Sequence, residues 1–358
     1  MKVGIFGGAF NPPHIGHVQA AKTAVENNNI DLLIVIPTGI SPHKGLPDDS
    51  PNTEARFIMT QNAFTSSKGI IVSDIEINSC ESNYTIDTVR AVIQDYPKCD
   101  ILLLVGTDMY NTLDSWKDSD ELLDAVTPVL LSRDVIKISS SEIRKMLPLR
   151  EGREYLAESN YSFIIKNRLY NAKPDWTWLR NKAFSMLSPL RIPHVYACEV
   201  EAVRLAERWD VNSDDAQEAA ILHDITKKLD FSQNMCIIAE HDVTLNELGS
   251  HGEKLLHSIT GALLAQSEFG VSDAVADAIR WHTTGRANMS MLEKVIYTAD
   301  YIESTRDFPG VDLLRKAAYE NIDAAMVIGL KMTINDLKSR GITPDSSTYE
   351  ALEDLSKS

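Results

Sequence analysis

A change in hydrophobic pattern near residue 172 constrains the fold of this chain more than any other feature of its sequence. Before that point, short apolar or β-branched runs alternate with segments whose apolar residues recur at helical spacing. The expected strands are residues 3–6, 32–36, 70–75, 101–105 and 127–131, and the helical segments between them include Val18–Glu26 and Glu54–Phe64. Strands that alternate with helices predict a doubly wound parallel α/β sheet, in which ligands bind at the carboxyl ends of the strands.

Beyond residue 172, strand-like runs nearly disappear and helical periodicity continues to residue 355. The helices expected here include Val195–Trp209, Asp214–Leu222, Ser258–Phe269, Asp273–Trp281 and Leu292–Ile302. The segment Ala172–Asp175 contains a proline and is a suitable linker. A chain of 358 residues exceeds one ordinary hydrophobic core. We therefore expect two domains, an α/β domain over residues 1–172 and an all-α bundle over residues 173–358.

Composition argues against several classes of partner. The chain has 35 Lys and Arg residues against 51 Asp and Glu residues, and both halves share this acidic excess, so nucleic acid is not an expected partner. No apolar run approaches the length of a membrane span and no signal peptide is recognisable, so we expect no membrane partner and a cytoplasmic location. Cys80, Cys99, Cys198 and Cys236 lack CxxC spacing and are expected to be buried, unpaired thiols.

A histidine–aspartate pair in the second half carries the clearest chemical signal. His223 and Asp224 are adjacent within the helical segment 219–228, and a neutral imidazole beside a carboxylate can hold one divalent cation or bridge two. Taken alone, such a pair is more often a surface hydrogen bond on a helix than a set of metal ligands. Further histidines and an aspartate in or beside helical segments favour a metal site. The six candidate ligands are His194, His223, Asp224, His257, His282 and Asp300. This set is large enough to hold two metal ions.

The first expected strand leads into a loop rich in glycine and proline over residues 7–17. Gly7 and Gly8 allow the backbone to approach a ligand closely, and two prolines stiffen the turn so that His14 and His17 can converge. An anion bound there would meet backbone N–H groups, the positive end of the following helix and two imidazoles. The alternative is a glycine turn with two solvated histidines.

This loop closely resembles the GxFxPxHxGH signature of the HxGH nucleotidyltransferase superfamily. Further segments resemble motifs of bacterial nicotinate mononucleotide adenylyltransferases: residues 37–44 the PxxxPPHK loop, 83–88 the SYTxDT element, 106–108 the GxD turn and 138–144 the ISSTxIR motif. The last segment is also a helix capping box, with Ser139 at the helix start and Glu142 three residues later. The resemblance extends to about Tyr170 and implies a Rossmann-like fold.

The resemblance implies that nicotinate mononucleotide attacks the α-phosphorus of ATP, giving the deamido-NAD dinucleotide and pyrophosphate. Alignment and charge neutralisation suffice for this reaction, without a covalent enzyme intermediate. The resemblance assigns His14 and His17 to the charge of the transition state. It assigns Lys44, Ser140 and Arg144 to the triphosphate, with Mg²⁺ shared between the phosphates.

Other residues of the first half are implied to bind the nucleotides. Thr85 and Trp116 would hold the pyridine nucleotide. The remaining residues implied to bind substrate are Gly7, Gly8, Phe10, Gly106, Asp108 and Ser139. The chain departs from the family in two places, since Asn11 replaces the usual aspartate and the segment leading to Ile138 is much shorter than in the family.

The helical half resembles the HD phosphohydrolases of the YqeK type, which are linked to symmetric hydrolysis of diadenosine tetraphosphate. Matching segments are residues 189–194, 219–228, 255–257, 278–286, 299–303 and 306–310. The resemblance implies that the six ligands hold two transition-metal ions, with iron as the expected identity, although such ligands also accept Mn, Co, Ni or Zn. Paired cations lower the pKa of a shared water and polarise phosphate oxygens. Lys227 and Arg286 are implied to bind phosphates, with Asp224 and Lys227 serving catalysis.

The sequence as a whole predicts a bifunctional enzyme that acts on ATP, nicotinate mononucleotide and diadenosine tetraphosphate. Two alternatives concern the first domain. It could be a nucleotide sensor without catalysis that regulates the hydrolase, as the shortened segment before Ile138 suggests, or it could use another mononucleotide acceptor. A homo-oligomer is compatible with the sequence.

Overall fold

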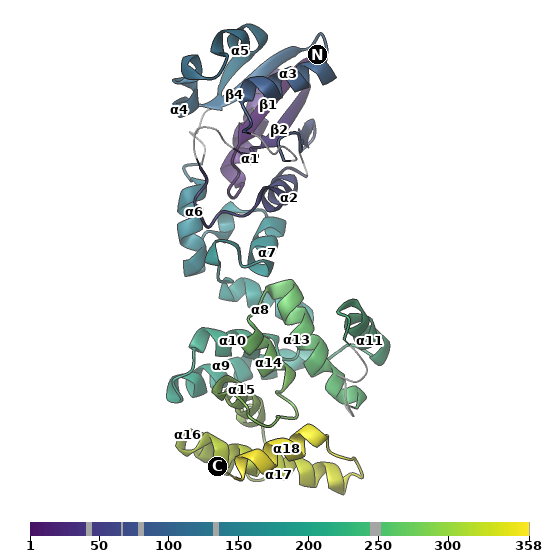
Figure 1. Ribbon diagram of the computed structural model, residues 1–358. Helices are drawn as coiled ribbons and strands as arrows, with labels where there is room; N and C mark the ends of the chain where they lie inside the picture. The colour runs from purple at the N-terminus through teal and green to yellow at the C-terminus, as the bar shows by residue number, and fades with distance from the viewer. Residues whose placement is uncertain (41–44, 66, 78–81, 132–135, 244–251, 358) are drawn as a thin grey trace. The chain divides into compact units, whose positions relative to one another are not determined.

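The computed structural model describes residues 1–40, 45–65, 67–77, 82–131, 136–243 and 252–357 (Figure 1). The chain divides into two compact units, Met1–Asp175 and Trp176–Ser358. The segment expected to be a linker is hydrogen-bonded to the first unit. The backbone N–H of Lys173 donates to the Leu147 carbonyl at 3.1 Å, and that of Asp175 donates to the Tyr161 hydroxyl at 2.6 Å.

Five parallel strands form the sheet of the first unit, in the order β3-β2-β1-β4-β5 (Figure 1). The strands are β1 (Lys2–Gly8), β2 (Leu32–Pro37), β3 (Ile70–Val72), β4 (Asp100–Gly106) and β5 (Thr127–Leu131). The expected strands are confirmed, except that β3 ends three residues before the predicted end at residue 75. The strand stops there because a turn follows, in which the Ile77 N–H donates to the Asp74 carbonyl at 2.8 Å.

Helices cover both faces of this sheet, which confirms the doubly wound α/β class. Alternate residues of β1 point to opposite faces. Val3 and Ile5 belong to one apolar cluster with Val89 of α3 (Thr85–Asp95), whereas Phe6 belongs to another with Phe64 of α2 (Thr53–Phe64). The other helices of this unit are α1 (Ile15–Asn28), α4 (Thr107–Tyr110), α5 (Ser119–Ala125), α6 (Ser140–Met146) and α7 (Glu158–Lys166).

The second unit is all-helical in its described residues, as expected. Its helices are α8 (Trp176–Ser185), α9 (Ile192–Arg208), α10 (Ser213–Leu222), α11 (Phe231–Glu240), α13 (Leu256–Phe269), α14 (Asp273–Arg280), α15 (Met291–Ile302), α16 (Val311–Glu320), α17 (Ile322–Ser339) and α18 (Ser346–Leu355). Helix α9 packs against α10 and α15, and α13 packs against α14 (Figure 1). A Cβ atom on Gly261 of α13 would lie 3.3 Å from the His223 carbonyl, so glycine allows α13 to approach the end of α10 closely. Among the described helices, none has the length and apolarity needed to cross a membrane.

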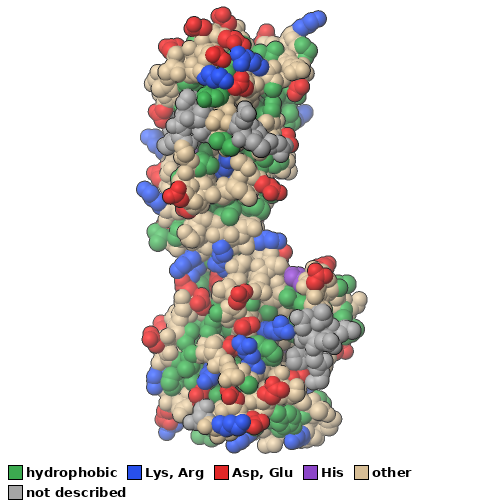
Figure 2. All heavy atoms as spheres, viewed as in Figure 1, with side chains coloured by type: hydrophobic (Ala, Val, Ile, Leu, Met, Phe, Trp, Pro, Cys, Tyr) green, Lys and Arg blue, Asp and Glu red, His purple; other side chains and the backbone are tan. Residues whose placement is uncertain are grey.

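The surface carries charges of both signs. Lys and Arg side chains are interspersed with Asp and Glu over the face shown in Figure 2. The described cysteines are unpaired. Cys198 is buried and Cys99 is only partly buried. The expectation of burial is wrong for Cys236, because α11 buries Asn234, Ile237 and Ile238 and turns Cys236 to solvent. Cys80 lies outside the described residues.

Candidate metal centre and nucleotide pocket

The second unit brings the six candidate metal ligands together. They come from α9 (His194), the end of α10 (His223 and Asp224), α13 (His257), the turn after α14 (His282) and α15 (Asp300). Three overlapping groups of these residues each have ligand atoms within 4.8 Å of one another. The groups are His194–His223–Asp224, His223–His282–Asp300 and Asp224–His257–His282. Helices far apart in the sequence therefore direct this whole set to one place.

Hydrogen bonds to the backbone orient three of the imidazoles. In His223, His257 and His282, Nδ1 lies 2.6 to 2.8 Å from the carbonyl oxygen three residues earlier. A carbonyl oxygen only accepts, so Nδ1 carries the proton and Nε2 of the neutral ring keeps its lone pair. The three Nε2 lone pairs are therefore available to a cation.

The unprotonated nitrogens face one another. His257 Nε2 lies 3.3 Å from His282 Nε2, and His194 Nε2 lies 3.4 Å from His223 Nε2. Two lone pairs at this separation repel each other unless a proton or a metal ion lies between them. Asp224 Oδ1 is also buried without a hydrogen-bond partner among the described residues, 3.4 Å from His257 Nε2. These features fit divalent metal ions.

The charge states of the cluster suit metal binding. Burial lowers the pKa values of His257 and His282, which keeps both rings neutral near pH 7. Burial opposes ionisation of Asp224, but His223 outweighs it and holds the pKa of this carboxyl well below its usual range. Contact with His194 also lowers the pKa of Asp300, again against the effect of burial. Burial opposes a charge on His223, but Asp224 outweighs it and raises the pKa of this imidazole. The cluster thus offers neutral imidazoles at His257 and His282 beside ionised carboxylates.

Two arginines bind the carboxylates of the cluster. Arg191 contacts Asp224 Oδ2 through both Nε and Nη2. Arg306 donates from Nη2 to Asp300 Oδ1 at 2.6 Å and from Nε to the Asp300 carbonyl at 2.8 Å. Their side chains remain 28% and 33% exposed, respectively, whereas that of Asp224 is fully buried. Both cations therefore reach from the ligand carboxylates toward solvent.

The two residues expected to bind phosphates differ in their surroundings. Lys227 Nζ lies 2.9 Å from His257 Nε2, and its side chain is 40% exposed, so it lies at the edge of the cluster. Arg286 instead donates to Glu293 at 2.6 Å and to Asp277 at 3.2 Å. The structure brings Lys227 to the ligands and engages Arg286 with carboxylates on α14 and α15.

Sequence reasoning missed three residues of this centre, namely Arg191, Arg306 and Glu303. Glu303 is completely buried, and its Oε1 lies 3.0 Å from His194 Nδ1. Helical spacing could have identified two of them. Arg191 precedes His194 by three residues and Glu303 follows Asp300 by three, and residues at this spacing share a helix face.

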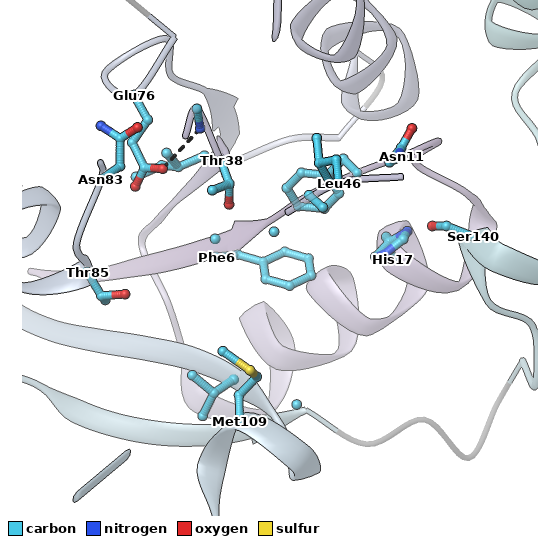
Figure 3. A pocket seen from close by; sticks show the side chains of 18 of the residues that line it. Phe6, Asn11, His17, Thr38, Leu46, Glu76, Asn83, Thr85, Met109 and Ser140 are labelled. Carbon is cyan, nitrogen blue, oxygen red and sulfur yellow. Dashed lines mark hydrogen bonds between the residues drawn. The ribbon is translucent and has the colours of Figure 1, made fainter. Parts of the chain in front are cut away.

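The first unit contains a cavity of about 590 Å³, within the range of small-molecule sites, at the carboxyl ends of β1 and β4 (Figure 3). His17 and Ser140 lie at one end of it, and Glu76 and Thr85 lie at the other. The expected substrate-site residues that line the cavity are Gly7, Gly8, Phe10, His17, Thr85, Gly106, Trp116, Ser140 and Arg144.

The two histidines of the glycine-rich loop cap α1. His14 Nδ1 accepts from the Gly16 N–H at 3.1 Å, and His17 Nδ1 accepts from the His14 N–H at 3.2 Å. Each neutral ring therefore carries its proton on Nε2, which makes Nε2–H a donor suited to a phosphate oxygen. The ring centroids are 3.7 Å apart, and His14 is buried beside the cavity-lining His17. This arrangement differs from a turn with two solvated histidines.

Helix α6 holds the same loop from the other side. Ser140 Oγ donates to the Pro12 carbonyl at 2.8 Å, and Arg144 Nη1 donates to the Asn11 carbonyl at 2.6 Å. Two of the three residues expected to bind the triphosphate, Ser140 and Arg144, thus also fix the loop carrying both histidines.

Asn11, which replaces the family's aspartate, both donates and accepts hydrogen bonds. Its Nδ2 donates to Ser50 Oγ at 2.7 Å, and its Oδ1 accepts from the Tyr170 hydroxyl at 2.7 Å. An ionised aspartate could only accept from both partners. The asparagine therefore fits its neighbours and links the loop to Tyr170, far along the chain.

Besides His14, two expected site residues among those that the structure describes, Ser139 and Asp108, do not line the cavity. Ser139 caps α6 through a capping box with Glu142, so the capping interpretation of this motif is realised. Asp108 is exposed on α4. Lys44 lies outside the described residues.

The sequence analysis also missed a polar cluster at the cavity wall around Glu76. Glu76 Oε1 accepts from the Thr88 hydroxyl at 2.6 Å, and Oε2 accepts from the Gly39 N–H at 3.3 Å. The fully buried Arg56 donates to the carbonyls of Ala9 and Gly39. A lone glutamate or arginine gives no periodic signal, so the sequence alone did not mark these residues.

Two family models match separate parts of the chain. One is described as Cytidylyltransferase-like and matches residues 5–146, and the other is described as HD domain and matches residues 191–305. The first match falls within the unit that holds the cavity, and the second spans all six candidate metal ligands.

Three relatives are similar over a large part of their own length. A symmetrical bis(5'-nucleosyl)-tetraphosphatase of Halalkalibacterium halodurans is 38% identical over 181 residues, which cover 48% of this chain and 96% of that protein. A probable nicotinate-nucleotide adenylyltransferase of Gemmatimonas aurantiaca is 32% identical, covering 49% of this chain and 94% of that protein. A probable nicotinate-nucleotide adenylyltransferase/Ap4A hydrolase of Mycoplasma genitalium is 28% identical and covers 94% of this chain and 99% of that protein.

Proposed function

This chain belongs to the family that joins a nicotinate-nucleotide adenylyltransferase to an HD-domain tetraphosphatase, and we propose that residues 1–172 and 173–358 carry these two activities. The second domain would hydrolyse diadenosine tetraphosphate symmetrically to two ADP. The first would transfer AMP from ATP to nicotinate mononucleotide. The full-length similarity to a relative named for both activities supports a single bifunctional polypeptide.

The observation that carries the hydrolase proposal is the set of unprotonated Nε2 atoms facing one another around Asp224. The six ligands would hold two divalent transition-metal ions, with iron as the proposed identity. The sharing of His223, Asp224 and His282 between overlapping ligand groups supports two adjacent sites. Such ions, when bound, polarise phosphate oxygens and lower the pKa of water.

The proposed hydrolysis is balanced by water alone. Water supplies the oxygen of the new P–O bond, the bond from one central phosphorus to the oxygen that bridges the two central phosphates breaks, and the departing ADP takes up the released proton. Lys227, at the edge of the cluster, would stabilise charge on the departing phosphate. Arg286 has no part in this proposed phosphate binding, because Glu293 and Asp277 already engage its guanidinium.

The hydrolase is tested on the purified full chain loaded with Fe or Mn. We expect about two metal ions per chain by elemental analysis and ADP as the product from diadenosine tetraphosphate. Asp224→Ala should lose both the metal and the hydrolysis while adenylyl transfer persists, which serves as the internal folding control. Full hydrolysis by metal-free protein would overturn the proposal.

The first domain would align two nucleotides and neutralise charge. The Nε2–H groups of His14 and His17 are the proposed donors to the transferring phosphoryl group, and Ser140 and Arg144 would bind the triphosphate together with Mg²⁺. Thr85 and Trp116, which line the cavity, would hold the pyridine nucleotide. Convergence of the loop, α1 and α6 on one cavity supports this assignment.

The transferase is tested by pyrophosphate release from ATP, Mg²⁺ and nicotinate mononucleotide. We expect turnover that His17→Ala reduces by roughly 100-fold or more, as for removal of a donor to transition-state charge. Binding of ATP without pyrophosphate release would instead support the sensor alternative. A higher rate with nicotinamide mononucleotide would identify a different acceptor.

A further inference from the structure

We infer that Arg306 and Lys227 hold the phosphates on opposite sides of the scissile bond and so determine where a dinucleoside polyphosphate is cut, with Arg191 between them. This inference rests on the proposed hydrolase function. It assigns to Arg191 and Arg306, which the sequence analysis did not select, a role in substrate register.

The ligand cluster is elongated, and the two cations lie at its ends. His257 shares a ligand group with Asp224 and His282, but none of the three groups contains His257 together with His194 or Asp300. Lys227 Nζ lies 2.9 Å from His257 Nε2 and 3.9 Å from Asp224 Oδ1. At the other end, Asp300 Oδ1 lies 3.0 Å from His194 Nε2, and Arg306 binds this same Asp300 oxygen at 2.6 Å.

Arg191 lies between these ends. Arg191 binds Oδ2 of Asp224. The other carboxylate oxygen of Asp224, Oδ1, lies 3.4 Å from His257 Nε2 and 3.7 Å from His282 Nε2. Asp224 is shared by two of the three ligand groups and is therefore the central carboxylate of the cluster. Arg306, Arg191 and Lys227 thus contact Asp300, Asp224 and His257, respectively.

The two arginines keep donors available for a ligand. Each guanidinium has five N–H groups. Arg306 uses two of them on Asp300, and Arg191 directs Nε and Nη2 to Asp224, so in both residues the Nη1 group has no partner among the described residues. Both side chains are about one third exposed or less, so these donors open toward solvent from partly desolvated positions. Such donors suit phosphate oxygens.

The backbone beneath Arg306 is held firmly. Arg315 donates from Nε to the Ile302 carbonyl at 2.9 Å and from Nη2 to the carbonyls of Glu303 and Arg306 at 3.0 and 2.8 Å. These bonds fix the turn that follows α15 and carries Arg306. A fixed guanidinium can define a position along a phosphate chain, which a freely moving surface cation cannot.

The charges of the site favour a chain with several phosphates. Arg191, Arg306 and Lys227 balance the carboxylates of Asp224, Asp300 and Glu303, which leaves the excess positive charge of bound divalent ions for the substrate. A polyphosphate with one negative charge on each phosphate can meet that excess along its length. With Arg306 and Lys227 holding the outer phosphates, a central P–O–P linkage lies over the metal ligands. Cleavage of that linkage yields two nucleoside diphosphates.

Arg306→Gln and Lys227→Gln in the metal-loaded full chain test this inference, with Arg204→Gln as the control on α9, where Arg204 is 66% exposed. Three quantities are measured: metal content, affinity for a diadenosine tetraphosphate analogue with a methylene group between the central phosphates, and the products from diadenosine tetraphosphate. We expect unchanged metal content and at least tenfold weaker analogue binding in both test variants. We also expect AMP and ATP to appear beside ADP, and wild-type behaviour in the control.

Each contrary outcome has a separate meaning. Wild-type analogue affinity with ADP as the only product in both test variants would overturn the inference. Loss of metal from Arg306→Gln that Arg306→Lys restores, with normal analogue binding, would show that Arg306 only supports Asp300 and would equally overturn it. If the wild-type chain binds the analogue but cleaves no diadenosine tetraphosphate in any metal-loaded state, the proposed function itself fails.

Discussion

His194 Nδ1 lies 3.0 Å from Oε1 of Glu303, a carboxylate that is completely buried. The backbone N–H and the hydroxyl of Thr305 also donate to this carboxylate. Burial opposes ionisation, but these hydrogen bonds and that of His194 outweigh it and lower the pKa of Glu303. The ionised carboxylate holds the imidazole proton on Nδ1 and directs Nε2 toward Asp300. Glu303 therefore orients a ligand without being one.

Substitution Glu303→Gln should weaken the metal centre while leaving the ligands in place. Loss of an oriented partner of a metal-binding histidine typically costs about 10- to 100-fold in metal affinity or activity. We expect a loss of this size in metal retention during competition with a chelator, and in hydrolysis of diadenosine tetraphosphate. Glu353→Gln, at an exposed ion pair on α18, is the matched control. Equal metal retention in the two variants would contradict the role given to Glu303.

Gly39 should tolerate no side chain. A Cβ atom there would collide with the Glu76 carbonyl and with the Asn83 side chain, and a rigid backbone atom cannot move away cheaply. We expect Gly39→Ala to destabilise the first unit by about 1–3 kcal/mol and to reduce adenylyl transfer. Urea unfolding of the first unit measures the cost, and hydrolase activity should persist. Gly45→Ala, where a Cβ atom meets nothing within 4 Å, should unfold like the wild type.

Glu76 should make the stability of the first unit depend on pH. Burial raises its pKa, although the hydrogen bonds from Thr88 and the Gly39 N–H and the charge of Arg56 oppose this shift. The folded chain therefore binds this proton more tightly than the unfolded chain. The resulting stabilisation is full below the unfolded pKa and is lost as pH rises through the folded pKa.

Glu76→Gln should remove that dependence. Between pH 4 and pH 7 the free energy of unfolding of the variant should rise relative to the wild type, by about 1.4 kcal/mol for each unit by which the pKa is raised. Urea unfolding at several pH values gives this difference. The exposed Glu54→Gln variant on α2 should follow the wild type at every pH. Parallel curves for Glu76→Gln and the wild type would show that burial does not perturb this carboxyl.

The spacing of apolar residues predicted the fold well, because both the alternation typical of strands and the helical repeat are strong in this sequence. Val3 and Ile5 alternate with Phe6 along β1, and each set packs on its own face of the sheet. The ligand set was also within reach of sequence reasoning, since each histidine lies in or beside a helix. The β3 boundary was less accessible, because the turn after Val72 depends on one backbone hydrogen bond rather than on a period.

Partners that depend on tertiary contacts could not be predicted from the sequence. Arg286 and Arg306 are both arginines in the second half, yet one meets Glu293 and the other meets the ligand Asp300. Sequence spacing does not distinguish these two environments. The burial of Arg56 was equally hidden, because its polar partners are backbone carbonyls brought together by the fold.

A hydrogen bond between Tyr170 and Asn11 restrains the loop that carries His14 and His17. The Tyr170 hydroxyl donates to Asn11 Oδ1 at 2.7 Å, and both residues are buried. Tyr170→Phe leaves this oxygen without its donor, at a cost of about 1–3 kcal/mol. Since Asn11 lies three residues before His14, a less restrained loop should lower the rate of adenylyl transfer more than it weakens ATP binding.

Kinetics and binding together separate this effect from general destabilisation. Tyr155→Phe, at a partly exposed position in the same unit, is the control and should keep the wild-type rate. A loss in ATP affinity equal to the loss in rate would place Tyr170 in nucleotide binding instead. A wild-type rate in Tyr170→Phe would mean that Ser140 and Arg144 fix the loop without help, because they hold the carbonyls of Pro12 and Asn11 from α6.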